Sequence, residues 1–594
     1  MKKIVVLILA LFLANLSFAQ TETGFRVHSH NDYLQNIPFW KAYAAGATSV
    51  EADVFLVGDS LYVAHTESEI DKDLRFEDLY LNPIQKSLAL GLGFDRPFQL
   101  LIDIKSESYS TLEAITKTLE KYPQIIADEN IAIVISGNRP KPSEYINYPS
   151  YILFDYQSLD AITDSSILDK IALISLSFKN FSEWNGKGRL TAEDLKKVSS
   201  TINLAHALGK PFRFWATPDS KSAWKAFSDL GVDFINTDMP FDCADYLSNL
   251  DFRTYKNTVF SEVYKPTFES DQKQEAVKNI ILMIGDGNGL TQISATALAN
   301  NGALSLTQLK SIGFLKTQSA DDFTTDSAGA GTALFTGQKA PNRSIGSDIY
   351  GKPLENITEL LSKKGFVSGI VTTDEIIGAT PSAFYAHQKD RSMSEEITAD
   401  LSKSKLSLFI SEGQTSSAEK AQMGNFKMLS SAAQVGESNT DAVGLLMPFA
   451  SSEDAEKKGL AIATDNALQF LKAKEKPFFL LVEGAKIDSY GHAKDIGGVI
   501  REGIGFDKAI TKALKFADLN KNTLVIITAD HETGGLTIPQ GNLQKNLIEG
   551  DFTTHDHTGT MVPVFAYGPQ SDKFQGVYEN SLLFDKMINA LLLR

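Results

Sequence analysis

Short apolar runs rich in β-branched residues alternate with helical patterns along most of the chain, and this alternation limits the possible folds most strongly. In the first part of the chain, helical patterns such as Thr191–Leu208 separate eight candidate strands. The candidates are Arg26–Ser29, Ser49–Phe55, Gln99–Ile104, Ile131–Ser136, Tyr151–Asp155, Ala172–Leu176, Phe212–Ala216 and Asp233–Asn236. Eight strand–helix units within about 220 residues predict a (β/α)8 TIM barrel, whose functional residues lie at the carboxyl ends of the strands.

A second alternating series begins at Asn279, and its strands differ in character. They are continuous apolar runs, at Asn279–Ile284, Gly365–Thr372, Phe478–Val482, Thr523–Thr528 and Val562–Tyr567. Such runs suit a parallel sheet that helices cover on both faces. We therefore expect a doubly wound α/β sandwich over residues 278–594, joined to the barrel (residues 20–245) by a polar linker over residues 246–277.

The N-terminus has the pattern of a secretory signal peptide. Two lysines precede an apolar stretch, and Ser17-Phe18-Ala19 offers small residues for cleavage. The stretch is too short for a comfortable membrane span. We therefore expect residues 1–19 to be removed from an exported protein, periplasmic or secreted, that has no stable membrane span.

The charge of the chain excludes one broad class of partner. The formal net charge is −16 and no long basic run exists, whereas binding a nucleic-acid backbone needs clustered Lys and Arg. A negative protein that handles anionic substrates must neutralise them locally, which points to bound cations. The single cysteine, Cys243, cannot form an internal disulfide.

The run TTDSAGAGTALFTGQK places Ser327 directly after Asp326 and before small residues. This pattern suits a nucleophile at the start of a helix, where backbone N–H groups and the helix terminus favour a tetrahedral anion. Ser and Asp also cap ordinary helices, so the run taken alone is equally compatible with a structural role.

Acidic and imidazole groups repeatedly follow the buried strands of the second series. Asp286 follows the first strand in a glycine-rich turn that lacks a P-loop lysine, so the pattern favours a cation there rather than a phosphate. The other groups of this kind are Glu483, Asp488, His492, Asp530, His531 and His557. Zinc takes His and Asp, and hard cations take carboxylates and hydroxyls. The set as a whole predicts a metal site beside Ser327.

This half of the chain resembles the alkaline phosphatases. The matching pieces, in the order of the family, are IGDGNG, TTDSAGAGTALFTG, TTDEIIGATPSAFYAHQKDR, LVEGAKIDSYGH, TADHETGG and HTGTMVPVFAYGP. By this resemblance, Ser327 is the nucleophile that becomes phosphorylated and Arg391 grips the phosphate. The resemblance also implies two Zn²⁺ and one Mg²⁺. Their ligands would be Asp488, His492 and His557 at the first zinc, Asp286, Asp530 and His531 at the second, and Asp286, Thr380 and Glu483 at the magnesium.

Two features depart from the pattern of the family. Gly378 lies where relatives usually carry Asp or His beside the magnesium, so we expect a loosened third metal that an aspartate at this position would tighten. Leu401–Ala450 is short and irregular beside the usual insertion of the family, which leaves open whether the protein forms a homodimer.

Of two neighbouring histidines, the HTG context favours His557 over His555 as the ligand.

Charged residues also gather at the strand ends of the predicted barrel. Glu51 and Asp53 lie two residues apart and so on one face of a strand, and Asp103 and Lys105 repeat this arrangement. His65 follows on the next short strand, in VAHTES. Buried charges are costly without a partner, so the pattern favours a divalent metal. The alternative is a polar barrel mouth without catalysis.

The barrel half resembles glycerophosphodiester phosphodiesterases and related phospholipase-C-like barrels. His30, Glu51, Asp53 and His65 match their first His, E-x-D pair and second His, with His28 as the rival for the first histidine. The resemblance implies Mg²⁺ or Ca²⁺ bound by Glu51, Asp53 and Asp103, with His30 and His65 as base and acid. The opening HSHND departs from the common H-R-G, whose arginine meets phosphate, so diesterase activity is in question.

Together these patterns predict an exported, bifunctional phosphoesterase acting on small phosphate monoesters and diesters. One alternative is an active alkaline phosphatase with a catalytically silent barrel that binds phosphorylated ligands. Another is a sulfatase or phosphomutase on the same scaffold, but the S/C-x-P-x-R context of sulfatases is absent around Ser327.

Overall fold

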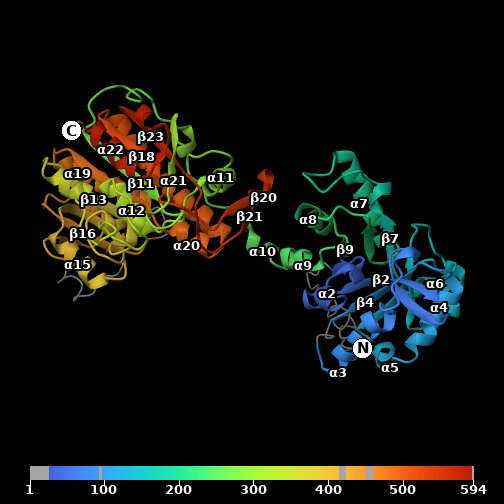
Figure 1. The fold of residues 1–594 in the computed structure, drawn as a ribbon. Helices are drawn as coiled ribbons and strands as arrows, with labels where there is room; N and C mark the ends of the chain where they lie inside the picture. Colours follow the sequence, from blue (N-terminus) through green and yellow to red (C-terminus); the bar gives the residue numbers. More distant parts are fainter. Residues whose placement is uncertain (1–25, 93–95, 414–422, 450–458, 592–594) are drawn as a thin grey trace, which may run out of the picture. The chain divides into compact units, whose positions relative to one another are not determined.

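The computed structural model describes residues 26–92, 96–413, 423–449 and 459–591. The predicted signal peptide, residues 1–19, lies outside these ranges. Contacts within the chain divide it into two compact units, with the boundary between Leu250 and Asp251 (Figure 1). In the described ranges, no helix combines the length and the apolar composition that a membrane crossing requires.

The first unit contains a closed barrel of eight parallel strands, as the sequence predicts. They are β1 (Arg26–Ser29), β2 (Ser49–Val57), β4 (Phe98–Ile104), β5 (Ile131–Gly137), β6 (Ile152–Tyr156), β7 (Ile171–Ser177), β8 (Phe212–Trp215) and β9 (Phe234–Thr237). Strand β1 pairs with both β2 and β9, which closes the ring. A short strand, β3 (Ser60–Val63), pairs antiparallel with β2. It ends before His65, so the prediction that His65 lies on this strand is wrong.

The helices of the first unit follow the strands in the order expected of a TIM barrel. They are α2 (Trp40–Ala44), α3 (Asn82–Ala89), α4 (Ser108–Leu119), α5 (Pro123–Ala127), α6 (Ser165–Asp169), α7 (Ala192–Ala207), α8 (Lys221–Asp229) and α9 (Pro240–Ser248). Helix α7 confirms the predicted helical pattern, and the Thr191 side chain caps it by accepting a hydrogen bond from the Asp194 N–H.

The interior of the barrel changes from apolar to polar along the strands. Leu101, Val134, Leu173 and Phe234, one from each of four strands, form a separate apolar cluster. Side chains two residues apart share a strand face. The residues two positions further along are Asp103, Ser136, Ser175 and Asn236. The polar layer therefore lies toward the carboxyl ends of the strands, where barrel sites form.

The second unit contains a ten-stranded sheet. Its order is β15 (Lys427–Leu429), β16 (Val443–Met447), β14 (Leu406–Glu412), β13 (Val367–Glu375), β17 (Phe478–Gly484), β11 (Asn279–Gly285), β18 (Thr523–Thr528), β23 (Val562–Tyr567), β12 (Ser311–Lys316) and β24 (Gly576–Glu579). All five predicted strands are present. However, β23 runs antiparallel to both of its neighbours, so the prediction of a parallel sheet is wrong at this strand.

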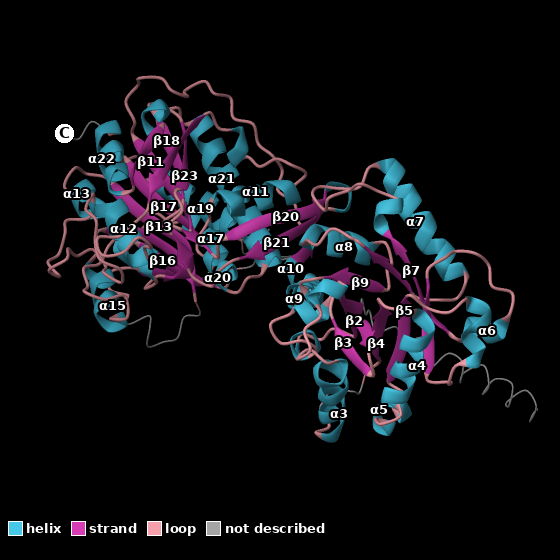
Figure 2. Cartoon of the chain, turned by 45° about the vertical axis from the view of Figure 1, so that its right-hand side comes forward, coloured by secondary structure: helices cyan, strands magenta, loops and turns pink. Residues whose placement is uncertain are grey.

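Helices cover both faces of this sheet, as Figure 2 shows with strands in magenta and helices in cyan. They are α11 (Leu290–Ala299), α12 (Ser327–Thr336), α13 (Ile357–Ser362), α14 (Ala379–Ala383), α15 (Ser394–Lys403), α17 (Ala432–Gly436), α19 (Leu460–Ala473), α20 (Lys486–His492), α21 (Ile496–Leu519) and α22 (Ser581–Ala590). On β11, Ile280 and Leu282 belong to the core formed with α12 and α22, whereas Ile281 and Met283 belong to the core formed with α19 and α21. Burial on both faces explains the continuous apolar runs.

Two segments are more ordered than their composition suggests. The region predicted to be irregular, Leu401–Ala450, contributes β14, β15 and β16 to the sheet. In the region predicted to be a linker, β10 (Thr254–Lys256) pairs with β21 (Leu547–Phe552), which also pairs with β20 (Leu536–Asn542). Backbone pairing to distant strands orders both segments.

Candidate functional sites

Ser327 begins α12, with Asp326 as the N-cap residue. The Asp326 carboxylate accepts a hydrogen bond from the Gly329 N–H at 2.9 Å, so Asp326 rather than Ser327 caps the helix. The Ser327 hydroxyl oxygen lies 3.3 Å from Nε2 of His531. Arg391 approaches from the other side, with Nη1 3.1 Å from the Asp326 Oδ2. Ser327 and Arg391 line one open pocket, so the predicted nucleophile and phosphate-binding residue lie together.

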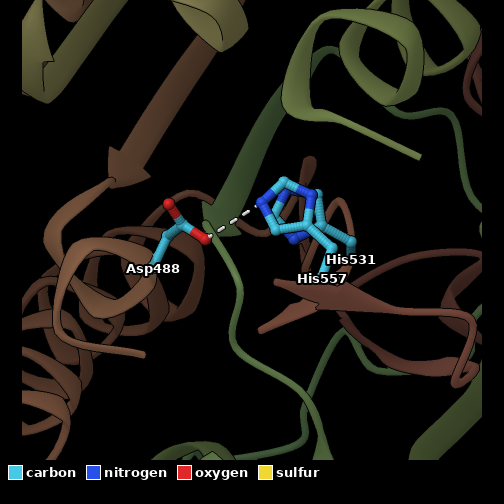
Figure 3. Close-up of side chains that lie close together, drawn as sticks. All are labelled: Asp488, His531 and His557. Atoms are coloured by element: carbon cyan, nitrogen blue, oxygen red, sulfur yellow. Dashed lines mark ion pairs between the residues drawn. The ribbon is translucent and has the colours of Figure 1, made fainter. Parts of the chain in front are cut away.

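The residues predicted for the first zinc also line this pocket. Helix α20 places Asp488 and His492 one turn apart, with His492 Nε2 3.3 Å from Asp488 Oδ2. His557 Nε2 lies 3.5 Å from Asp488 Oδ1 and 3.2 Å from His492 Nε2. Figure 3 shows the His531 and His557 rings beside the Asp488 carboxylate. His555 is exposed, so His557 is the histidine that joins the cluster, as the HTG context predicts.

The residues predicted for the second zinc meet where β11 and β18 end. His531 Nε2 lies 3.5 Å from Asp286 Oδ1 and 3.2 Å from Asp530 Oδ2. The ring of His531 stacks on that of His557 with 3.5 Å between ring centroids, so the two clusters are adjacent. This adjacency is the arrangement that a two-metal site requires.

The electrostatics of the second cluster fit a bound cation. Asp286 Oδ1 and Asp530 Oδ2 are buried without a hydrogen-bond partner. Burial and the nearby Asp530 carboxylate raise the pKa of Asp286 well above its usual range. Uncompensated buried carboxylates are costly, and an imidazole with two carboxylates is a donor set that zinc accepts.

The residues predicted for magnesium lie beside this cluster. Strands β11 and β17 pair in register, with Ile284 opposite Glu483, so Asp286 and Glu483 occupy adjacent strand ends. Burial and the neighbouring Asp374 carboxylate raise the pKa of Glu483 to about 8, with the nearby Thr380 hydroxyl acting in the opposite direction. The Thr380 hydroxyl is buried near Glu483, but the geometry between them falls short of a hydrogen bond. Carboxylates and a hydroxyl are the ligands that a hard cation prefers.

The expectation that Gly378 loosens the third metal stays a prediction, but the space beside Gly378 is occupied. A Cβ placed on Gly378 would lie 1.9 Å from Oδ2 of Asp374, so a carboxylate from the end of β13 already fills the space. A side chain at position 378 would therefore require the Asp374 carboxylate to shift. The sequence reasoning overlooked Asp374 because it lies four residues before Gly378.

The barrel brings its predicted residues together in the middle of β2 and at the carboxyl end of β4. Oxygens of Glu51, Asp53 and Asp103 lie within 4.8 Å of one another, close enough to share a metal ion. Strands β2 and β4 pair with Asp53 opposite Asp103. Lys105 Nζ lies 3.0 Å from Asp53 and 3.1 Å from Asp103. The acidic cluster is thus partly neutralised by a lysine.

The structure separates the two candidate first histidines of the barrel. The His28 side chain is fully buried and is hydrogen-bonded to Ser49 at 2.7 Å and Glu51 at 2.8 Å. Burial and the charge of Arg213 lower the pKa of His28 to about 4. The His30 side chain is 26% exposed, and its Nδ1 lies 2.7 Å from Asp238 Oδ1. Only His30 is therefore accessible to a substrate.

The second predicted histidine, His65, lies in the loop after β3. Its Nδ1 is 3.0 Å from Asp53 Oδ2, and its side chain is mostly exposed. The hydroxyl of Tyr33 donates a hydrogen bond to the same Asp53 oxygen at 2.8 Å. The sequence reasoning missed Tyr33, which follows the histidines in HSHNDY and lies at the same strand end.

Sequence reasoning also missed Arg213, which lies inside the barrel. Its Nη1 is 2.8 Å from Glu51 Oε2, and both side chains are almost fully buried. The alternation in FRFW on β8 is the signal that could have found Arg213, because it places this residue on the face opposite the two phenylalanines. A buried partner for Glu51 fixes the position of that carboxylate.

Arg213→Met is expected to lower the free energy of unfolding of the barrel by about 3–5 kcal/mol, since it leaves the buried Glu51 with one charged partner fewer. Urea unfolding followed by tryptophan fluorescence measures this change selectively, because all four tryptophans lie in the barrel. The control is Arg75→Met, which removes a surface pair with Glu77 and should cost less than about 1 kcal/mol. Equal destabilisation by the two variants would contradict the structural role of Arg213.

Comparisons with known proteins match different families to the two units of the chain. The family model described as alkaline phosphatase matches residues 277–420, 444–550 and 545–593. In the barrel, an AIM6-like phosphodiesterase domain matches residues 17–91, and the glycerophosphoryl diester phosphodiesterase family matches residues 211–240. These matches cover the segments that carry the two histidines and Arg213.

Individual relatives match the second unit. Alkaline phosphatase 4 of Bacillus subtilis (strain 168) is 30% identical over an alignment of 404 residues that covers 52% of this chain and 88% of that protein. The alkaline phosphatase of Escherichia coli (strain K12) is 30% identical over 53% of this chain and 86% of its own length. The solved alkaline phosphatase of the Antarctic bacterium TAB5 is 36% identical, with a TM-score of 0.50, over 54% of this chain and all of that one. The chain therefore belongs to the alkaline phosphatase family, and it carries a phosphodiesterase-like barrel ahead of the phosphatase domain.

Proposed function

We propose that the C-terminal domain hydrolyses phosphate monoesters through a phosphoserine at Ser327, and that the barrel hydrolyses phosphodiesters to supply it. The observation that carries the proposal is the convergence of Ser327, Arg391 and the first metal-ligand cluster on one pocket, with the second cluster directly behind it. We place the barrel at residues 20–245 and the phosphatase at residues 278–594, joined by residues 246–277.

In the proposed monoesterase reaction, the Ser327 oxygen attacks phosphorus and the bond to the ester oxygen breaks. The start of α12 points backbone N–H groups at the phosphoryl group. Arg391 can hold two phosphoryl oxygens as a fork, and Asp326 orients its guanidinium. Water then attacks the phosphoserine, which releases phosphate and restores the hydroxyl of Ser327.

The two clusters beside Ser327 fit Zn²⁺, and the third set fits Mg²⁺. Bound metals would supply positive charge that favours the ionised serine and stabilises the phosphoryl group in the transition state. His531 would hold the second zinc within reach of the Ser327 oxygen, since its Nε2 lies 3.3 Å away. Glu483 and Thr380 would hold the magnesium through oxygen atoms.

In the barrel, we propose that Glu51, Asp53 and Asp103 bind Mg²⁺ or Ca²⁺ and that His30 and His65 transfer protons. Against the effect of burial, the Asp238 carboxylate raises the pKa of His30, which suits a base that becomes charged. His65 lies beside Asp53, across the acidic cluster. Such a pair can take a proton from a nucleophile and give one to the leaving oxygen.

One observation favours the alternative of a silent, phospholigand-binding barrel. Lys105 already pairs with Asp53 and Asp103, so the acidic cluster has part of its charge balanced without a metal.

The signal-peptide pattern supports our further proposal that the protein is exported to the periplasm or secreted. The proposed substrates of both domains are small phosphate esters. If the barrel is silent, the proposed monoesterase activity of the C-terminal domain still stands.

Removing metals with a chelator is expected to lower hydrolysis of p-nitrophenyl phosphate by at least about 10²-fold, because several kcal/mol of transition-state stabilisation are lost. Activity should return when Zn²⁺ and Mg²⁺ are added together, and only in part with either alone. Metal content measured by mass spectrometry provides the control. Full activity in protein shown to be metal-free would contradict the proposed function.

A further inference from the structure

The absence of a side chain at Gly378 makes room for a neighbouring side chain and is not required by the backbone. The backbone angles of Gly378 are φ −56° and ψ 165°, which any residue can adopt. The obstacle to a side chain is Asp374, whose Oδ2 lies 1.9 Å and whose Cγ lies 2.6 Å from the position of a Cβ on Gly378. The absence of a side chain at Gly378 therefore admits the carboxylate of Asp374.

The backbone around Asp374 is held to the third metal site. The Thr372 hydroxyl donates a hydrogen bond to Glu483 Oε2 and accepts one from the Asp374 N–H at 2.9 Å. Thr372 also lies opposite Glu483 in the register of β13 and β17. Asp374 Oδ1 accepts a hydrogen bond from the Glu375 N–H at 2.8 Å. These bonds fix the Asp374 carboxylate beside Glu483.

The surroundings of Asp374 contain both acids and cations. Burial and neighbouring acids, Asp374 among them, raise the pKa of Asp286 and of Glu483. Burial also raises the pKa of Asp374, whereas Arg391 and Lys486 act in the opposite direction, although Arg391 also contacts Asp326 and Lys486 also pairs with Glu412 at 2.9 Å.

Two buried oxygens without a hydrogen bond also favour a cation. Asp286 Oδ1 and Thr380 Oγ1 have no hydrogen-bond partner, and both residues are more than nine-tenths buried. A carboxylate oxygen and a hydroxyl oxygen that complete no hydrogen bond match the preference of a hard divalent ion, and the carboxylate oxygen also lies 3.5 Å from Nε2 of His531 in the second cluster.

We propose that Asp374 is the further acid of the third site, so that Mg²⁺ bound by Asp286, Thr380 and Glu483 is also held by Asp374, directly or through one of its waters. Asp374 thus takes the place of a side chain that position 378 lacks. This inference rests on the proposed function, because it assumes that the third site binds Mg²⁺ beside the zinc pair.

The test measures Mg²⁺ affinity by titration calorimetry on the full-length, zinc-loaded protein. Asp374→Asn, which keeps the shape of the side chain, is expected to weaken Mg²⁺ binding by about 10- to 100-fold. The matched control is Glu375→Gln, the same change of charge one residue further along on an exposed side chain, and it should bind Mg²⁺ as the wild type does. Wild-type affinity in Asp374→Asn would overturn the inference.

A relocation experiment checks the geometry independently. Gly378→Asp alone should also weaken Mg²⁺ binding, because its Cβ displaces the Asp374 carboxylate. Combining Gly378→Asp with Asp374→Ala frees that space and should return the affinity to within about threefold of wild type. Tighter Mg²⁺ binding by Gly378→Asp alone than by wild type would show that the space is open, and would overturn the inference.

Failure of this inference and failure of the proposed function give different results. If the zinc-loaded wild type hydrolyses p-nitrophenyl phosphate but takes up no Mg²⁺ beyond an ion held by the barrel, the inference is overturned and the phosphatase stands. If the zinc-loaded wild type releases no phosphate, the proposed function is overturned. The Mg²⁺ titrations measure binding and do not depend on catalytic activity.

Discussion

Ser327→Ala is expected to lower phosphate release from p-nitrophenyl phosphate by at least about 10³-fold, because a covalent reaction cannot begin without its nucleophile. The fold should be almost unaffected. Asp326, not Ser327, caps α12, so the free energy of unfolding should change by less than about 1 kcal/mol. Initial rates at saturating substrate and urea unfolding measure the two quantities.

The matched control for Ser327→Ala is Ser571→Ala. Ser571 is buried as Ser327 is, and it follows β23. Because β23 runs antiparallel to its neighbours, its carboxyl end lies at the edge of the sheet opposite the metal clusters. Ser571→Ala should therefore keep its activity even if it loses stability. Near wild-type hydrolysis by purified Ser327→Ala would rule out the phosphoserine mechanism.

His30→Ala is expected to lower the release of inorganic phosphate from a glycerophosphodiester by at least about 10²-fold, because proton transfer by a positioned histidine contributes on that scale. The wild type should release phosphate from the diester in two steps, since the diesterase product is a monoester that the second domain can use. Joining the two domains raises the local concentration of that intermediate. Hydrolysis of p-nitrophenyl phosphate by His30→Ala should match that of the wild type.

Three further variants complete this experiment. His65→Ala should behave as His30→Ala does, whereas Ser327→Ala should accumulate the monoester. His206→Ala is the control, because His206 lies on α7 and pairs with Asp233 at 2.8 Å, away from the acidic cluster. If His30→Ala and His65→Ala release phosphate from the diester as fast as the wild type, the barrel is a binding module.

Local patterns were sufficient to predict most of the fold and of the candidate phosphatase site. Strands such as β18 and β23 are buried on both faces, and such burial requires a continuous apolar run that can be recognised without neighbours. Asp488 and His492 lie one helical turn apart, so their shared face followed from spacing alone. Ser327 was recognisable because a helix start and small residues occupy one short segment.

Other features depended on partners that are distant in the sequence. Continuous apolar residues do not encode strand direction, so the antiparallel course of β23 followed only from its pairing with β12 and β18. Arg213 became a partner of Glu51 only when closure of the barrel brought β8 close to β2. The sequence offers both His28 and His30 as the first histidine of the barrel site, and only their different burial in the fold distinguishes them.

The sequence by itself therefore determined two α/β domains and predicted the candidate metal ligands, because these depend on burial or spacing within one segment, whereas the role of Ser327 as nucleophile stays a prediction from the family resemblance. Only the tertiary structure decided which acid fills the space beside the third metal site. A glycine at position 378 reads as a missing ligand until the fold places Asp374 in the volume where its side chain would lie. Occupied volume is a property of packed neighbours, so it has no local signal in the chain.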